Sequence, residues 1–202
     1  MTKIKLCGLS RPCDIEAVNS LKPEYIGFVF APKSKRYVSP ERAKELKRLL
    51  DPAVTVVGVF VKETPETVAH FLNNDIIDLA QLHGGEDEDY IKELRKLTRK
   101  PVIKAFCIES ADDTAAAEQS LADYVLLDSG AGTGTVFDWN LIQNMQRPYF
   151  LAGGLGLSNV KDAVKKLKPY VIDVSSGIET NGVKDVCKMA EFVAAVRKEE
   201  RL

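Results

Sequence analysis

The sequence has little that would mark a membrane, secreted or nucleic-acid-binding protein. Its apolar runs are far shorter than the roughly 20 residues that a membrane-spanning helix needs. Lys and Arg number 28 against 29 Asp and Glu, and a formal net charge of −1 gives no broad positive field to attract phosphates. Residues 1–8 lack the apolar segment of a secretory signal. We therefore expect a cytoplasmic protein with neither membrane nor nucleic-acid partners.

Cysteine and histidine are scarce as well. The four cysteines (Cys7, Cys13, Cys107 and Cys187) show no C-x-x-C spacing, which argues against both a zinc site and a disulfide framework. Reduced thiols in an intracellular protein are the plain interpretation. The two histidines, His70 and His83, form no cluster with metal-ligand spacing. We expect neither a metal nor a cofactor.

Short apolar, β-branched runs recur regularly along the chain. Several are apolar at nearly every position, as strands buried on both faces are. The runs are Ile4–Cys7, Tyr25–Phe30, Val54–Val61, Ile76–Leu82, Val102–Cys107, Tyr124–Leu127, Tyr149–Ala152 and Val171–Val174.

Segments between these runs have helical spacing, with apolar stripes in Asp89–Leu97 and Val183–Val196. Ser39-Pro40-Glu41 and Thr64-Pro65-Glu66 are typical helix starts. About eight helices thus alternate with eight strands, which predicts a parallel sheet. Eight such units favour a closed (β/α)8 TIM barrel, and no linker divides residues 1–202, so we expect a single α/β domain. Periodicity alone leaves a doubly wound open sheet possible.

The placement of polar residues favours the barrel, because reactive groups lie after the strands at its C-terminal face. The first strand ends at Cys7, the fourth at His83 and the sixth at Asp128, while Arg36 lies in a cationic loop after the second. The last two strands run into Gly153–Gly156 and Ser175–Gly177. These two loops could be simple tight turns, but side by side they predict a phosphate site.

Two further features need care. The loop Gly130–Gly134 lacks the spacing and position of a dinucleotide fingerprint, so a mobile loop over the site or plain surface flexibility are the alternatives. A lone Cys7 is usually a core residue and a lone Asp128 a cap. Together with a phosphate site and a cationic loop, they favour proton transfer on a phosphorylated small molecule, with a thiolate as base and a carboxyl as acid.

Blocks along the chain resemble one enzyme family, phosphoribosylanthranilate isomerase, collinearly from Cys7 to Asp185. The sixth loop departs from the family pattern, since it ends in Thr135 where the family often has lysine. The matching blocks are Lys5–Gly8, Gly27–Phe30, Ser34–Tyr37, Val57–Phe60, Gln81–Gly84, Leu127–Ser129 with Gly132–Gly134, Phe137–Trp139, Leu151–Leu155, Asp173–Glu179 and Gly182–Asp185.

The resemblance implies an Amadori rearrangement in tryptophan biosynthesis, from N-(5′-phosphoribosyl)anthranilate to 1-(2-carboxyphenylamino)-1-deoxyribulose 5-phosphate. It implies Asp128 as general acid, Cys7 as general base and Arg36 as partner of the anthranilate carboxylate. Further substrate-binding residues follow from it: His83 lining the pocket, Asp173 on a ribose hydroxyl or as a buried structural carboxylate, and Gly153, Gly154, Ser175, Ser176 and Gly177 around the phosphate.

Two other functions stay open from the sequence. A binding module for phosphorylated sugars would use the same glycines without needing Cys7 and Asp128. A related barrel isomerase acting on a histidine-pathway aminoaldose is expected to carry paired carboxylates, where this chain offers Cys7. The sequence leaves the oligomeric state open between monomer and homodimer.

Overall fold

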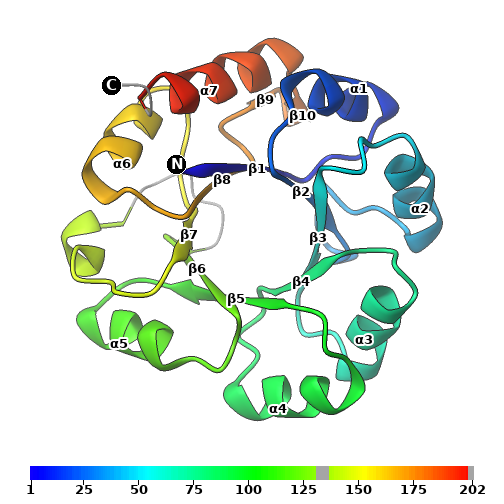
Figure 1. The fold of residues 1–202 in the computed structure, drawn as a ribbon, viewed down its shortest axis with the longest axis vertical. Helices are drawn as coiled ribbons and strands as arrows, with labels where there is room; N and C mark the ends of the chain where they lie inside the picture. Colours follow the sequence, from blue (N-terminus) through cyan, green and yellow to red (C-terminus); the bar gives the residue numbers. More distant parts are fainter. Residues whose placement is uncertain (131–136, 200–202) are drawn as a thin grey trace.

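The computed structural model describes residues 1–130 and 137–199. Eight parallel strands close into a barrel in simple chain order, which excludes the open sheet. Figure 1 shows the helices as a ring around the strands. The strands are β1 (Lys3–Cys7), β2 (Tyr25–Val29), β3 (Thr55–Phe60), β4 (Leu79–Leu82), β5 (Val102–Cys107), β6 (Tyr124–Asp128), β7 (Tyr149–Leu151) and β8 (Val171–Val174).

Seven α-helices are present in the described ranges. The predicted starts are confirmed, because the Ser39 and Thr64 hydroxyls accept hydrogen bonds from the amides of Arg42 and Thr67. No helix among the described residues is long and apolar enough to cross a membrane. The helices are α1 (Pro12–Leu21), α2 (Pro40–Arg48), α3 (Pro65–Asn73), α4 (Glu88–Leu97), α5 (Ala111–Gln119), α6 (Val160–Leu167) and α7 (Val186–Glu199).

Two local predictions were wrong. Between β6 and β7 the described residues form only a short 3-10 helix, η1 (Trp139–Ile142), in place of an eighth α-helix. The stripe Val183–Val196 is not one helix, because Val183 and Lys184 form β10, which pairs with β9 (Glu179–Thr180). Asp185 then accepts from the amides of Cys187 and Lys188 and begins α7.

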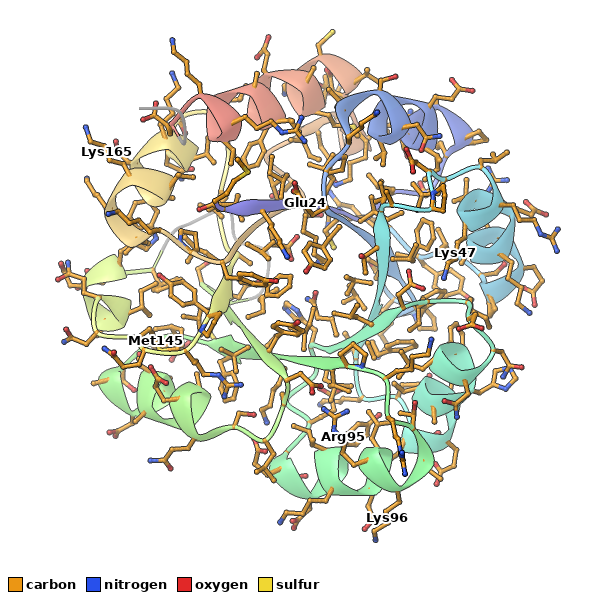
Figure 2. All side chains as sticks on the ribbon, viewed as in Figure 1. Glu24, Lys47, Arg95, Lys96, Met145 and Lys165 are labelled. Atoms are coloured by element: carbon orange, nitrogen blue, oxygen red, sulfur yellow. The ribbon has the colours of Figure 1, made fainter. Side chains whose placement is uncertain are left out.

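The strands separate two apolar regions by their alternation. Ile4 and Leu6 of β1 belong to the large core between strands and helices. A smaller core lies inside the barrel and includes Tyr25, Val57 and Phe150. Side chains alternate along each strand, so these residues face the interior while their neighbours in the strand face the helices. Figure 2 shows the labelled Lys96 and Lys165 pointing outward from the ring of helices.

The same alternation turns three predicted site residues, Cys7, His83 and Asp128, toward the barrel interior. Cys7 packs with Val29 and Val59 in a third apolar cluster at the C-terminal end of the barrel interior. His83 and Asp128 share this parity on β4 and β6, counted from interior residues Leu79 and Leu126. These three side chains therefore face the barrel interior near the ends of their strands.

Candidate active site

Cys7 ends β1 and is 9 % exposed. Its sulfur lies so close to β2 that a Cβ on Gly27 would stand 2.6 Å from Sγ. Burial raises the pKa of the Cys7 thiol above its usual range, although the cations Lys5 and Lys184 act in the opposite direction. The thiol is therefore the predominant form in the free protein, and the two lysines are the groups that favour the thiolate.

A buried ion pair lies directly below Cys7. Lys5 Nζ is 2.7 Å from Asp173 Oδ2 and donates a second hydrogen bond of 2.9 Å to Gln81 Oε1. Burial alone would lower the pKa of Lys5, but Asp173 and Cys7 more than offset this and raise it. The second oxygen of Asp173, Oδ1, is buried without a protein partner among the described residues. A free acceptor of this kind suits a substrate hydroxyl.

His83, just after β4, and Asp128, at the end of β6, face each other across the intervening strand β5. The Asp128 Oδ1 atom accepts a 3.0 Å hydrogen bond from the Gly130 amide, and Oδ2 lies 3.5 Å from His83 Nε2. Both side chains line a cavity of about 440 Å³ that Ala105 and Phe106 also border. Cys7 is not among the residues that line this cavity. The predicted loop Gly130–Gly134 lies outside the described residues beyond Gly130.

The loops after β7 and β8 meet, as a shared phosphate site requires. Gly156 and Gly177 form a parallel bridge, and a Cβ on Gly177 would collide with the Leu155 carbonyl. Gly153 and Gly154 both have positive φ, +84° and +60°, which favours glycine at each. The Ser175 hydroxyl ties β8 to β1 by donating to the Cys7 carbonyl at 3.2 Å.

Arg36 reaches the same rim from the loop after β2 and is held by Glu179. Its Nε and Nη2 atoms donate to the two Glu179 oxygens at 2.5 and 3.0 Å. Lys184 donates to Glu179 at 2.8 Å and also to Ser175. Burial opposes ionisation of Glu179, but the hydrogen bonds from Arg36 and Lys184 lower its pKa to about 2. Two close cations around one carboxylate leave a net positive charge beside Cys7.

Sequence reasoning gave no role to Lys5, Gln81, Glu179 or Lys184. For the first two a signal existed: each lies two residues before a predicted site residue on a buried strand, and so points to the same side. A charged or amide side chain in such a position has to find a partner inside the barrel. His70 lies on α3, as expected, and away from the strand ends.

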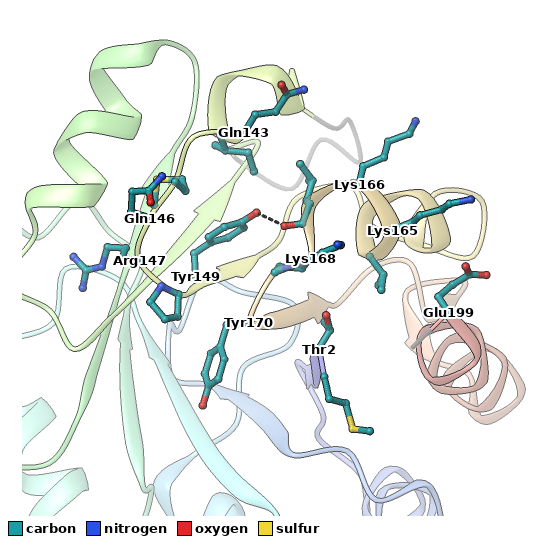
Figure 3. Close-up of a pocket in the computed structure, with 17 residues that line it drawn as sticks. Thr2, Gln143, Gln146, Arg147, Tyr149, Lys165, Lys166, Lys168, Tyr170 and Glu199 are labelled. Carbon is teal, nitrogen blue, oxygen red and sulfur yellow. Dashed lines mark hydrogen bonds between the residues drawn. The ribbon is translucent and has the colours of Figure 1, made fainter. Parts of the chain in front are cut away.

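A larger cavity, of about 860 Å³, lies at the other end of the barrel, as Figure 3 shows. Tyr149 at the start of β7 and Thr2 before β1 line it, with Arg147, Lys168 and Tyr170. Tyr149 there donates to the Leu167 carbonyl at 3.1 Å. Because the strands begin at this face, it is separate from the rim where Cys7, His83 and Asp128 lie.

Comparison with known proteins shows the family to which the chain belongs. The model of the family described as N-(5'phosphoribosyl)anthranilate (PRA) isomerase matches residues 4–195. The chain belongs to this family. N-(5′-phosphoribosyl)anthranilate isomerase from Endomicrobium trichonymphae is 45% identical over 202 residues, covering 98% of this chain and 99% of that protein. The protein is accordingly an isomerase of tryptophan biosynthesis that performs an aldose–ketose type rearrangement.

Solved structures of phosphoribosyl anthranilate isomerases share the fold throughout. The enzyme from Thermotoga maritima has a TM-score of 0.89 at 34% identity, covering 98% of this chain and 100% of that one. A second structure, with a TM-score of 0.87, 34% identity and the same coverage, is a complex with reduced 1-(o-carboxyphenylamino)-1-deoxyribulose 5-phosphate. A third, at 35% identity, TM-score 0.86 and the same coverage, describes monomers generated from the dimeric Thermotoga maritima enzyme.

Proposed function

We propose that the chain carries out this isomerisation by general acid/base catalysis, with Asp128 as the acid and Cys7 as the base. The observation that supports the proposal is their common position: each ends a strand of the barrel, with a side chain on the interior layer at the C-terminal rim. Barrel enzymes hold their reactive groups at this rim. The substrate is N-(5′-phosphoribosyl)anthranilate, a small phosphorylated molecule.

The first step opens the furanose ring. The Asp128 carboxyl gives its proton to the ring oxygen while the bond from C1 to that oxygen breaks. The lone pair of the anthranilate nitrogen forms the C=N bond, which yields a protonated Schiff base and leaves Asp128 as a carboxylate. The cavity bordered by Ala105 and Phe106 gives Asp128 a partly apolar surrounding.

The second step removes the proton from C2. The positive Schiff base acidifies this C–H bond, and the Cys7 thiolate accepts the proton to give an enolamine that tautomerises to the ketone. Lys5 and Lys184 stabilise the thiolate, while burial opposes it. The ring has to open first, because without the adjacent C=N bond the C2 proton is too weakly acidic for a thiolate to remove.

Arg36 and the paired glycine loops bind the two anionic ends of the substrate in this proposal. Glu179 accepts from two donors of the Arg36 guanidinium and so orients it. The remaining N–H groups of Arg36 are available for the anthranilate carboxylate. The amides around Gly153, Gly154, Ser176 and Gly177, next to Ser175, hold the phosphate. Asp173 accepts from a ribose hydroxyl through Oδ1.

The test of the two roles is turnover in single variants, followed by the fluorescence decay of freshly made substrate. Asp128→Asn and Cys7→Ser should each abolish turnover without changing the far-UV circular dichroism spectrum. Cys13→Ser is the matched control, because Cys13 is exposed on α1 and should tolerate the change. Near-normal turnover in either active-site variant would refute its assigned role.

Three broader points belong to the same proposal. Residues 1–202 act as one domain, in keeping with the closed barrel of the described residues. The enzyme works in the cytoplasm on a small-molecule substrate. It is a monomer or a homodimer, which analytical ultracentrifugation over a range of protein concentrations would distinguish.

A further inference from the structure

A run of polar side chains crosses the barrel interior from the base to the acid. Lys5, next to Cys7, donates to Gln81 Oε1 at 2.9 Å. The Gln81 Nε2 atom lies 2.8 Å from His83 Nδ1, and His83 Nε2 lies 3.5 Å from Asp128 Oδ2. Lys5 is fully buried and Gln81 is 2 % exposed, so water has little part in the contact between these two.

Only one assignment of donors and acceptors satisfies the contacts of Gln81 with Lys5 and His83. A lysine ammonium only donates, so the oxygen of the Gln81 amide has to face Lys5. The NH₂ group of Gln81 then faces His83 Nδ1 and donates to it. A ring nitrogen that accepts a hydrogen bond carries no proton, so the ring proton of His83 has to be on Nε2.

Lys5 keeps this order fixed because it stays charged. Its ammonium lies 2.7 Å from the Asp173 carboxylate, and both groups are buried. The pair holds the pKa of Lys5 above its usual value, against the effect of burial. Gln81 thus faces a permanent cation on one side, and reversal of its amide would bring two donors together there.

We propose that Lys5 and Gln81 are positioning residues that hold His83 neutral, with its proton on Nε2, so that Asp128 faces an N–H group and not a full positive charge. The proposal rests on the proposed role of Asp128 as general acid. It changes the expected role of His83 from a pocket-lining residue to the group that sets the surroundings of the acid.

The chemical reason lies in the proton that Asp128 has to carry. A full positive charge a few ångströms away favours the ionised form of a carboxyl, and an ionised carboxyl cannot protonate the ring oxygen. A neutral imidazole supplies only a dipole. After the ring has opened, its Nε2–H stabilises the new carboxylate. The arrangement therefore keeps a full positive charge away from Asp128 before the step and offers its carboxylate an N–H donor after it.

The first test reads the tautomer directly by ¹⁵N NMR of the imidazole nitrogens at the pH of the activity assay. The chain has two histidines, and His70→Gln leaves His83 as the only signal. His70 lies on α3, away from the rim, so this variant should keep full activity. We expect one protonated nitrogen, Nε2, and one unprotonated nitrogen, Nδ1. A proton on Nδ1, or on both nitrogens, would overturn the proposal.

The second test reverses the hydrogen bond. Gln81→Glu keeps the shape of the side chain and its acceptor for Lys5, but offers Nδ1 an acceptor where it had a donor. We expect the ¹⁵N spectrum to show a proton on Nδ1 and kcat to fall about tenfold or more, as a wrong histidine tautomer does in other enzymes, with KM changed less. An unchanged tautomer and unchanged kcat would contradict the proposal.

A pair of His83 variants covers the case in which Gln81→Glu does not fold. The amide of a glutamine can place an N–H near the position of Nε2, whereas that of an asparagine reaches only the position of Nδ1. We expect His83→Gln to retain more kcat than His83→Asn. The reverse order would count against the proposal. Failure of the proposed acid is read separately: an active Asp128→Asn variant would refute that role and leave the NMR result for His83 as it stands.

Discussion

Cys7 accepts the C2 proton, in the proposed mechanism, from a position that is nearly closed to solvent. Sequence reasoning placed the thiol at a strand end, where it would serve as a base if its neighbours favoured the thiolate. Lys5 and Lys184 do so, but burial outweighs them and the pKa of Cys7 is raised. The balance depends on packing across β1, β2 and β8, which a linear pattern does not contain.

A raised pKa of the base predicts how the Cys7 thiol titrates. Because burial outweighs the two lysines, the Cys7 thiolate should form only above the pH at which an ordinary thiol ionises. The measurement is the ultraviolet absorbance of thiolate against pH for the parent and for Cys7→Ser, whose difference is the titration of Cys7 alone. Cys107→Ser is the matched control: the pKa of the Cys107 thiol is also raised, and its removal should leave that difference unchanged. A difference that titrates at or below the pH of an ordinary thiol would contradict the raised pKa.

Arg36 is expected to act on both binding and orientation of the substrate. Arg36→Met should raise KM and lower kcat, because a two-pronged contact positions the anthranilate as well as holding it. Lys35→Met is the matched control: Lys35 also approaches Glu179, at 3.6 Å, but its side chain is 63 % exposed. Steady-state kinetics of both variants should separate them. An unchanged KM in the Arg36 variant would exclude the contact.

At the scale of the elements, β2 controls the position of the base. A Cβ at Gly27 would lie 2.6 Å from Cys7 Sγ, so Gly27→Ala should displace the thiol and lower kcat about tenfold or more. Gly58→Ala on β3 is the control, because its Cβ would meet Ile77 at 2.7 Å in the outer core. It should lower the free energy of unfolding by about 1–3 kcal/mol and leave kcat of the folded protein intact.

Urea unfolding and steady-state kinetics on the same preparations measure both effects. Equal losses of kcat in the Gly27 and Gly58 variants would show that the barrel as a whole, and not the fit around Cys7, limits turnover.

The sequence predicted most of the strands because burial on both faces makes them apolar throughout. It predicted an eighth α-helix where η1 lies and joined Val183 to α7. Helical spacing of apolar residues cannot by itself place a helix start, and here Asp185 begins the helix by accepting from two amides. An aspartate two residues after Val183 was the available signal.

At the scale of the whole molecule, Glu179 joins the β2 loop, the end of β8 and β10 through Arg36 and Lys184. Its pKa is lowered to about 2 in the folded protein, from a usual value of 4.5. A carboxylate with a lowered pKa stabilises the folded state above its unfolded pKa, and the contribution is lost as pH falls through the folded one. Stability should therefore decline between about pH 4.5 and about pH 2.

The measurement is the free energy of urea unfolding at several acidic pH values for the parent and for Glu179→Gln. The parent should be the more stable at neutral pH, and the difference should shrink as the pH approaches 2. Asp89→Asn is a surface control, because the ion pair of Asp89 with Lys92 is exposed. A difference between parent and Glu179→Gln that stays constant with pH would refute the role of the charge.

The location of the site could be predicted because a parallel barrel brings all strand ends to one rim. Its inner connections could not. Lys5, Gln81 and His83 come from β1 and β4, and only closure of the sheet sets them in contact. The pairing of Arg36 with Glu179 likewise joins residues 143 positions apart.

The most direct test of the account is a crystal structure of this protein with the reduced product analogue bound. The account predicts one ligand that touches both side chains, with Cys7 Sγ against C2 of the sugar chain and the Asp128 carboxyl against the oxygen released from the ring. A ligand that contacts Asp128 in the cavity beside His83 but makes no contact with the buried Cys7 would contradict it.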